Sequence, residues 1–346
     1  RSFASIATPS SDDHVEIIEV GARDGLQNEK QAIPLETKIK LIERLAQTGL
    51  KTIEVGSFVS PKWTPQMANS SEILQHVLET PPQSPHPISY QFLVPNQRGF
   101  DNFLSTYSRL GYVSKSSNSE ETAGYVANDK RLPSAIGTVD VSLFTAATES
   151  FTQKNTNCSI SESLDRFRPI VTAAKALGLP VRAYISVALG CPYEGPVAPQ
   201  NVSELAINLL EMGADEISVA DTTGMGTPTT TRTLLKTLKA AGIEMPDIAL
   251  HFHDTYGQAL PNALVSLEYG VRKFDAAVAG LGGCPYSPGA TGNVSSEDLV
   301  YMMESLGART GVDLGALSEV GDWISHEVGR RNESRAGKAL LAKRKK

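Results

Sequence analysis

Eight apolar, β-rich segments alternate with helical segments along most of the chain, and this alternation is the feature that most limits its fold. The apolar segments are continuous, which is typical of strands buried on both faces of a parallel sheet. The predicted strands span residues 14–20, 51–57, 88–94, 138–144, 180–189, 215–221, 247–253 and 273–279. The helices that follow them span residues 35–47, 65–78, 99–109, 161–177, 202–212, 228–240, 259–269 and 296–306.

This repeat predicts an α/β fold, a closed (β/α)₈ TIM barrel with additional C-terminal helices. A barrel of this kind needs about 250 residues, which fits the catalytic segment that we assign to residues 14–311. A doubly wound sheet is the competing interpretation. It would normally carry a glycine-rich phosphate turn after its first strand, and the sequence VGARDGLQN at residues 20–28 does not match that pattern.

The remaining segments are predicted from their composition. Residues 312–346 form a C-terminal helical extension, and residues 1–13 are disordered or the remnant of an organellar presequence, since they contain Ser and Arg before the first acidic residue. Residues 111–135 are polar, Ser-rich and non-periodic. We expect a mobile insertion there, remote from the chemistry, because helix-to-strand connections lie at the N-terminal ends of barrel strands.

Charge and apolar patterning limit the partners. The formal net charge of −6 over 346 residues argues against a nucleic-acid partner. No apolar segment approaches the roughly 18 residues of a bilayer-spanning helix, so we expect no membrane partner. Three widely spaced cysteines favour a reducing compartment over a disulfide framework.

A pair of histidines ends the seventh predicted strand. His251 and His253 are two residues apart, so in a strand both imidazoles point to the same face. Such a pair is half of a metal site, and the alternative is two hydrogen-bonded histidines with a structural role. In a TIM barrel, chemistry gathers at the C-terminal strand ends. The other reactive residues predicted at these ends are Arg23, Asp24, Glu54, Asp221, and, in a glycine-rich loop over residues 280–293, Cys284 and Asn293.

The residue types at these ends favour a divalent cation. Asp24, His251, His253 and Asn293 would supply two nitrogens and two oxygens, which suits Mg²⁺ or Mn²⁺ better than structural zinc. Arg23 is a candidate cation for an oxygen that gains charge during a reaction, or a salt-bridge partner of a neighbouring carboxylate. For Cys284 we favour proton transfer over the alternative of a buried inert thiol.

Several motifs resemble the hydroxymethylglutaryl-CoA lyase family, within the superfamily of metal-dependent aldol/Claisen barrels that also contains pyruvate carboxyltransferase domains. They are VGARDGLQNEK (20–30), IEVGSFVSPKWTPQMA (53–68), TESFTQKNTNCSI (148–160), SVALGCPYEGPV (186–197), ISVADTTGMGTP (217–228), HFHDTYGQAL (251–260) and AGLGGCPYSPGATGNVSSEDLVYM (279–302). The resemblance covers nearly all of residues 15–306, and its Gly-Leu-Gly-Gly-Cys-Pro loop is characteristic of the lyases.

The resemblance implies roles for individual residues. Asp24, His251, His253 and Asn293 match the metal ligands, and Arg23 matches the essential arginine, which with Gln27 would bind substrate. Glu54 and Asp221 match acidic site residues, and Cys284 matches the catalytic cysteine. Ala22 and Thr223 depart from the residues common in the family, and residues 111–135 have no counterpart that we can match.

The implied reaction is cleavage of 3-hydroxy-3-methylglutaryl-CoA to acetyl-CoA and acetoacetate, a step of leucine degradation and ketone-body formation. His251 or Asp221 would take the hydroxyl proton, and the sequence does not separate them. Alternatives are a condensing acyl-CoA synthase of the same superfamily, a lyase for a longer-chain homologue and a non-catalytic barrel. The resemblance also implies a homodimer. The N-terminal composition favours the mitochondrial matrix, with the cytoplasm as the alternative.

Overall fold

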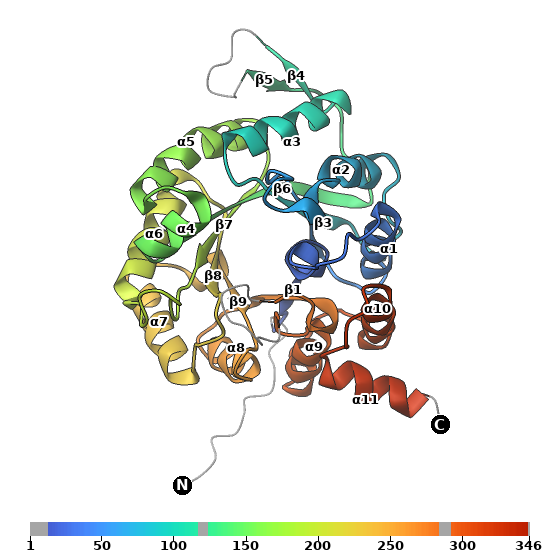
Figure 1. The fold of residues 1–346 in the computed structure, drawn as a ribbon, viewed down its shortest axis with the longest axis vertical. Coiled ribbons are helices and arrows are strands. Elements are labelled where there is room, and N and C mark those ends of the chain that lie inside the picture. The colour runs from blue at the N-terminus through green and yellow to red at the C-terminus, as the bar shows by residue number, and fades with distance from the viewer. Residues whose placement is uncertain (1–12, 117–123, 284–291, 345–346) are drawn as a thin grey trace.

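The chain folds into a closed barrel of eight parallel strands surrounded by helices (Figure 1). The computed structural model describes residues 13–116, 124–283 and 292–344. Around the barrel the strands are β1 (Glu16–Glu19), β10 (Lys273–Ala276), β9 (Ile248–Phe252), β8 (Glu216–Asp221), β7 (Val181–Ser186), β6 (Ile136–Ala146), β3 (Ile88–Leu93) and β2 (Thr52–Ser57). Pairing of β1 with β2 closes the ring, so the predicted (β/α)₈ barrel is confirmed.

Each predicted strand is followed by its predicted helix. These helices are α1 (Leu35–Ala46), α2 (Ser70–Glu79), α3 (Gln97–Arg109), α5 (Ile160–Ala176), α6 (Pro199–Met212), α7 (Pro228–Ala240), α8 (Ala259–Glu268) and α9 (Ser296–Ser305). Local chemistry fixes several ends. Ser159 and Glu162 form a reciprocal capping box at the start of α5, and Gly213 ends α6 in the left-handed conformation.

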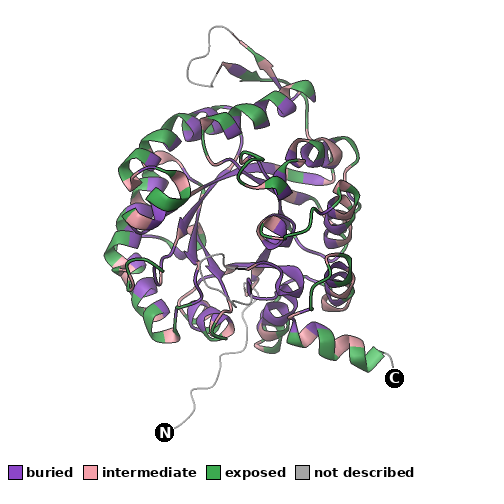
Figure 2. Cartoon of the chain, viewed as in Figure 1, coloured by how far each residue is buried: buried purple, intermediate pink, exposed green. Residues whose placement is uncertain are grey.

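The strands have two different faces. Figure 2 shows the strands almost wholly buried and the helices buried only where they face the barrel. Outward side chains such as Phe252 pack with the helices into an apolar core. Inward side chains are often polar: His251 precedes Phe252 in β9, and Arg182 and Glu54 lie inside the barrel on β7 and β2. This polar interior leads to the C-terminal strand ends, where the candidate site lies.

The segment at residues 111–135 is not structureless. It contains a two-stranded antiparallel hairpin, β4 (Val113–Lys115) and β5 (Tyr125–Ala127), while residues 117–123 lie outside the described part. Stacking anchors the hairpin to α3, because the Tyr112 ring lies 4.7 Å from the Tyr107 ring at an interplanar angle of 16°. The described part of the insertion therefore contains regular strands, and its mobility stays a prediction. The hairpin precedes β6, so it lies toward the N-terminal strand ends, and in Figure 1 it projects beyond α3.

Two helices follow the barrel, as predicted. Helix α10 (Leu314–Glu327) packs against α1 and α9, and α11 (Arg335–Arg344) packs against α10 and α9. Helix α4 (Glu149–Thr156), a short polar helix between β6 and α5, was not predicted from the sequence. Within the described ranges, no helix combines the length and apolar character needed to cross a bilayer.

The start of α11 is held by one carboxylate of α9. Asp298 Oδ1 accepts hydrogen bonds from Ser334 Oγ at 2.8 Å and from the backbone N–H of Ala336 at 2.6 Å. Its Oδ2 accepts from the backbone N–H of Arg335 at 3.1 Å. Asp298 therefore satisfies N–H groups that have no partner within α11 itself.

Replacing Asp298 with Ala is expected to loosen α11 while leaving the barrel folded. Loss of a capping carboxylate costs about 1 kcal/mol, so amide hydrogen exchange in α11 should quicken by roughly five- to tenfold. Exchange in β7 and β8 should not change. Asp313→Ala, which removes the equivalent cap of α10, is the matched control and should affect α10 instead. Unchanged exchange in α11 of Asp298→Ala would contradict the assignment.

Candidate metal centre and active site

Three metal-ligating side chains converge at the C-terminal strand ends. Asp24 lies in η1 (Gly21–Gly25), the π-helical turn after β1, while His251 is in β9 and His253 directly follows it. One ligand atom from each of the three residues lies within 4.8 Å of the others, and His251 Nε2 is 4.0 Å from Asp24 Oδ2. Segments more than 200 residues apart thus meet because β1, β10 and β9 are neighbours in the barrel.

Asn293 completes the cluster. Its Nδ2 donates to Asp24 Oδ2 at 2.9 Å and to the backbone oxygen of Leu281 at 3.0 Å. Gly282 permits this approach, because a Cβ there would lie 2.7 Å from Asn293 Nδ2. Two buried atoms, Asn293 Oδ1 and His253 Nδ1, have no hydrogen-bond partner among the described residues. Buried polar atoms without a protein partner, beside a carboxylate, fit a site for a divalent cation.

The charge states at neutral pH suit a cation. Burial alone would raise the pKa of the Asp24 carboxyl, but Arg23 and the two imidazoles outweigh it and lower that pKa to about 2. Burial, reinforced by His251, lowers the pKa of His253 to about 4. Asp24 is therefore ionised and His253 neutral, the forms in which each side chain binds a metal.

Arg23 is fixed between two carboxylates. Its Nε donates to Glu54 Oε2 at 2.7 Å and its Nη1 to Asp24 Oδ1 at 2.7 Å, while Nη2 lies 2.6 Å from Glu54 Oε2. Burial would lower the pKa of Arg23, but Glu54 and Asp24 raise it above its ordinary value. A guanidinium has five N–H groups, so two remain for a substrate oxygen. The salt-bridge interpretation of Arg23 and the substrate-binding one are therefore compatible.

The two candidate bases differ in their surroundings. His251 Nδ1 lies 3.1 Å from Asp275 Oδ2, and its Nε2 faces Asp24. Asp221 Oδ2 accepts the backbone N–H of Gly226 at 2.9 Å, while its buried Oδ1 has no partner among the described residues. Burial raises the pKa of Asp221 to about 7, against the opposing effect of backbone N–H groups and His251.

The last two predicted site residues are less informative. Gln27 is half-buried two residues beyond Gly25, on the turn that carries Asp24. Cys284 lies outside the described residues, as does most of its loop.

Sequence reasoning missed two buried carboxylates beneath this loop. Glu19 Oε1 accepts the backbone N–H of Val278 at 2.9 Å, and Glu297 Oε2 accepts that of Ala279 at 2.9 Å. Both therefore hold η5 (Val278–Gly280), where Ala279 has a φ of 60° and the glycine-rich loop begins. Burial raises the pKa of Glu297 to about 8 and that of Glu19 to about 7. Glu19 is an acidic residue inside the apolar segment of a predicted strand, and this was the signal that could have indicated a buried carboxylate.

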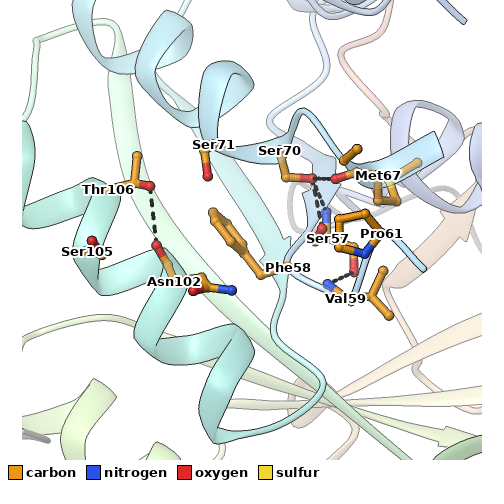
Figure 3. A pocket seen from close by; sticks show the side chains of 11 residues that line it. Ser57, Phe58, Val59, Pro61, Met67, Ser70, Ser71, Asn102, Ser105 and Thr106 are labelled. Carbon is orange, nitrogen blue, oxygen red and sulfur yellow. Dashed lines mark hydrogen bonds between the residues drawn. The ribbon is translucent and has the colours of Figure 1, made fainter. Parts of the chain in front are cut away.

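The cavities among the described residues include two beside the barrel. One, of about 350 Å³, is lined by residues 28–34, Gly282, Gly283 and residues 327–330, so it adjoins the loop that positions Asn293. The other, of about 230 Å³, lies between β2, α2 and α3, with Ser70 and Ser71 on one side and Asn102 and Thr106 on the other (Figure 3). None of the predicted site residues lines the second cavity. None of them lines the first cavity either, but that cavity reaches Gly282, which lies against Asn293.

Comparison with known proteins identifies the family. The HMGL-like family model matches residues 14–103 and 114–324. The chain belongs to the HMGL-like family. Its match omits residues 104–113, which include the end of α3 and the first residue of β4, and it resumes at residue 114 within the hairpin.

Close relatives of this HMGL-like protein are lyases. It is 46% identical to "3-hydroxy-3-isohexenylglutaryl-CoA/hydroxy-methylglutaryl-CoA lyase" of Pseudomonas aeruginosa, over 95% of this chain and 98% of the relative. It is 46% identical to the mitochondrial hydroxymethylglutaryl-CoA lyase of Rattus norvegicus, covering 94% and 89% of the two chains. Identity to the cytoplasmic 3-hydroxy-3-methylglutaryl-CoA lyase of the same organism is 42%, covering 96% and 86%.

Solved structures that are similar to this chain are also lyases. The hydroxymethylglutaryl-CoA lyase of Pseudomonas aeruginosa superposes with a TM-score of 0.82 at 45% identity, covering 96% of this chain and 98% of that one. An HMG-CoA lyase from Acinetobacter baumannii, solved in complex with coenzyme A and 3-methylmalate, has a TM-score of 0.80 at 31% identity, covering 96% of each chain.

Replacing Glu297 with Gln should make the stability of the protein less sensitive to pH. The pKa of Glu297 is about 8 in the folded chain and near 4.5 when unfolded. The folded state therefore binds the extra proton between these values, and stability falls as pH rises through this window, by up to about 1.4 kcal/mol per pH unit. Gln cannot titrate. Urea unfolding should show Glu297→Gln gaining about 1–3 kcal/mol relative to the wild type between pH 6 and pH 8.

Exposed Glu204 on α6 supplies the control. Glu204→Gln should follow the wild-type pH profile. A constant difference between Glu297→Gln and wild type across pH 6–8 would mean that Glu297 keeps its ordinary ionisation in the folded protein.

Proposed function

We propose that this protein cleaves 3-hydroxy-3-methylglutaryl-CoA to acetyl-CoA and acetoacetate, with Mg²⁺ or Mn²⁺ held by Asp24, His251, His253 and Asn293. The observation that carries this proposal is the convergence of the Asp24, His251 and His253 ligand atoms next to the fixed guanidinium of Arg23. The family membership supports the reaction class.

The reaction removes a proton from a tertiary hydroxyl while the neighbouring C–C bond breaks toward the thioester. A bound divalent cation would supply Lewis acidity for that hydroxyl. Arg23 donates its two remaining N–H groups to the thioester oxygen as that oxygen gains enolate charge. Glu54 holds the Arg23 guanidinium in that direction, because it accepts from Nε and faces Nη2.

Asp221 is the better candidate for the base. His251 uses Nδ1 toward Asp275 and Nε2 toward the cluster, which leaves neither nitrogen for a substrate proton. Asp221 retains a buried oxygen without a partner among the described residues, and its pKa of about 7 matches proton transfer near neutral pH. Cys284 is proposed, from the family resemblance alone, to deliver a proton to the acetyl-CoA carbanion.

The coenzyme A part of the substrate is proposed to lie along the 350 Å³ cavity. This cavity adjoins Gly282 and Gly283. Glu29, which pairs with Arg330 at 2.7 Å, and Glu327 also line it, so Lys30 and Arg330 supply basic side chains but no net positive charge. Phosphate groups favour such basic side chains. In the sequence, Gln27 stands between Asp24 and Asn28, the first residue that lines this cavity. Gln27 is proposed to contact the acyl chain.

Longer acyl chains are a second candidate substrate class. The relative from Pseudomonas aeruginosa is named for both 3-hydroxy-3-isohexenylglutaryl-CoA and hydroxymethylglutaryl-CoA. Assaying both thioesters side by side, by acetyl-CoA release, decides between them. The same assay run with acetyl-CoA and a 2-oxo acid tests the condensing alternative, and failure of all substrates would favour the non-catalytic barrel.

A homodimer and a mitochondrial matrix location complete the proposal, with the cytoplasm as the alternative compartment. Relatives named for each of these two compartments are similar to this chain at 46% and 42% identity.

Mn²⁺ should bind with a stoichiometry of one per chain, measured by the loss of the free-ion signal in electron paramagnetic resonance. Asn293→Ala and His253→Ala remove a ligand each and should weaken Mn²⁺ binding by at least about tenfold. His326→Ala, an exposed histidine on α10, should bind as the wild type does. Wild-type protein that binds no Mn²⁺ would refute the metal site.

Arg23→Lys should lower kcat for acetoacetate release by about 10²–10³-fold with a small change in KM. A lysine keeps the charge but cannot contact Glu54, Asp24 and a substrate oxygen in one plane. Arg168→Lys, an exposed arginine on α5, is the matched control. Retention of wild-type kcat by folded Arg23→Lys would remove Arg23 from the mechanism.

A further inference from the structure

Arg182 is a fully buried arginine at the centre of the barrel, and the mechanism above does not use it. It lies on β7 with 2% of its surface exposed. Its Nε lies 2.9 Å from Glu216 Oε1, and Glu216 is also paired with Lys273 at 2.6 Å. This ion pair, toward the start of β8 and β10, holds the side chain by charge, since neither Arg182 Nε nor Glu216 Oε1 has a hydrogen-bond partner among the described residues. The two terminal nitrogens of the guanidinium then point into two hydrogen-bond chains toward the site, and Nη1 also donates to Gln91 Oε1 at 3.2 Å.

The first chain reaches the metal cluster. Arg182 Nη2 donates to Asp275 Oδ1 at 2.5 Å, and Asp275 Oδ2 accepts from Ser218 Oγ at 3.0 Å. The same Oδ2 lies 3.1 Å from His251 Nδ1. An ionised carboxylate can only accept, so Nδ1 must carry the proton. In neutral His251 the lone pair is therefore on Nε2, the nitrogen that faces Asp24.

The second chain reaches Arg23. Arg182 Nη1 lies 3.2 Å from the Tyr184 hydroxyl oxygen, which accepts its hydrogen bond. That hydroxyl donates to Glu54 Oε2 at 3.0 Å, the oxygen that also accepts from Arg23 Nε. Tyr184 is two residues beyond Arg182 on the same strand, so both side chains face the barrel interior. The Arg182 guanidinium also lies 4.8 Å from the centre of the Tyr184 ring.

We infer that Arg182 is a positioning residue that fixes both the metal-binding tautomer of His251 and the orientation of Arg23. This inference rests on the proposed function. A buried arginine that only neutralised Asp275 and Glu216 would need no contact with Tyr184. Instead, Nη2 leads through Asp275 to His251, and Nη1 leads through Tyr184 and Glu54 to Arg23. A lysine has a single nitrogen and cannot hold both directions.

Variants that each break one of the two hydrogen-bond chains should give different results. Asp275→Asn removes the ionised acceptor of His251 and should weaken Mn²⁺ binding by about 10–100-fold. Tyr184→Phe should leave Mn²⁺ binding within about twofold of wild type and lower kcat about tenfold with KM little changed, since it loses a hydrogen bond to a charged acceptor. Arg182→Lys should show both effects. Mn²⁺ binding is measured by electron paramagnetic resonance and kcat by acetoacetate release.

Arg168→Lys is the matched control, and thermal unfolding is recorded for every variant. If Arg182→Lys is less stable but binds Mn²⁺ and turns over as wild type does, its role is structural and the inference is overturned. If Arg182→Lys does not fold, Asp275→Asn and Tyr184→Phe decide. Wild-type Mn²⁺ affinity in Asp275→Asn, or equal loss of Mn²⁺ affinity in both variants, overturns the two-chain assignment. Wild-type protein that neither binds Mn²⁺ nor cleaves the thioester refutes the proposed function instead.

Discussion

Charges buried inside the barrel need partners of opposite sign, and this requirement organises the site. Removing an ion from water costs several kcal/mol unless a counter-ion and hydrogen bonds replace the solvent. Arg23 is enclosed by Asp24 and Glu54, and Arg182 by Asp275 and Glu216. Lys273 offsets Glu216. Two arginines then face three carboxylates, those of Asp24, Glu54 and Asp275. A divalent cation next to Asp24 would offset the remaining negative charge, which is an electrostatic reason for a metal at this place.

The barrel could be predicted because parallel strands are buried on both faces. A strand such as β9 therefore forms a continuous apolar segment, and eight such segments each followed by a helix admit few folds. The same signal is absent from the parts that were missed. Helix α4 buries only Phe151 and Thr152, so its sequence has no clear apolar face. Strands β4 and β5 have three residues each, and the hairpin depends on stacking between Tyr107 and Tyr112, which no local pattern reveals.

The candidate site was partly predictable for a geometric reason. Residues that follow neighbouring parallel strands meet at one face of a barrel, so Asp24, His251 and His253 could be grouped from strand positions, and Asn293 from the loop after the last strand. The structure brings these four together. Asp275, Tyr184 and Glu297 could not be placed in the same way. Asp275 and Tyr184 lie within strands, where the sequence does not say which side chain faces which. The hydrogen bond between Asp275 and His251 depends on the register of β10 against β9, and that between Tyr184 and Glu54 crosses the barrel interior from β7 to β2.

Adjacent residues of α9 link the site's support to the C-terminal extension, because they hold two different elements. Glu297 holds the backbone of Ala279 beneath the loop that leads to Asn293, and Asp298 caps α11. The backbone N–H of Glu333 donates to the backbone oxygen of Ala279 at 3.0 Å, so the segment before α11 also contacts this turn. The turn at Ala279 has a left-handed φ that costs free energy in a non-glycine residue. The carboxylates of Glu19 on β1 and Glu297 on α9, together with the segment before α11, stabilise it, so the turn that leads to Asn293 depends partly on a segment outside the eightfold repeat.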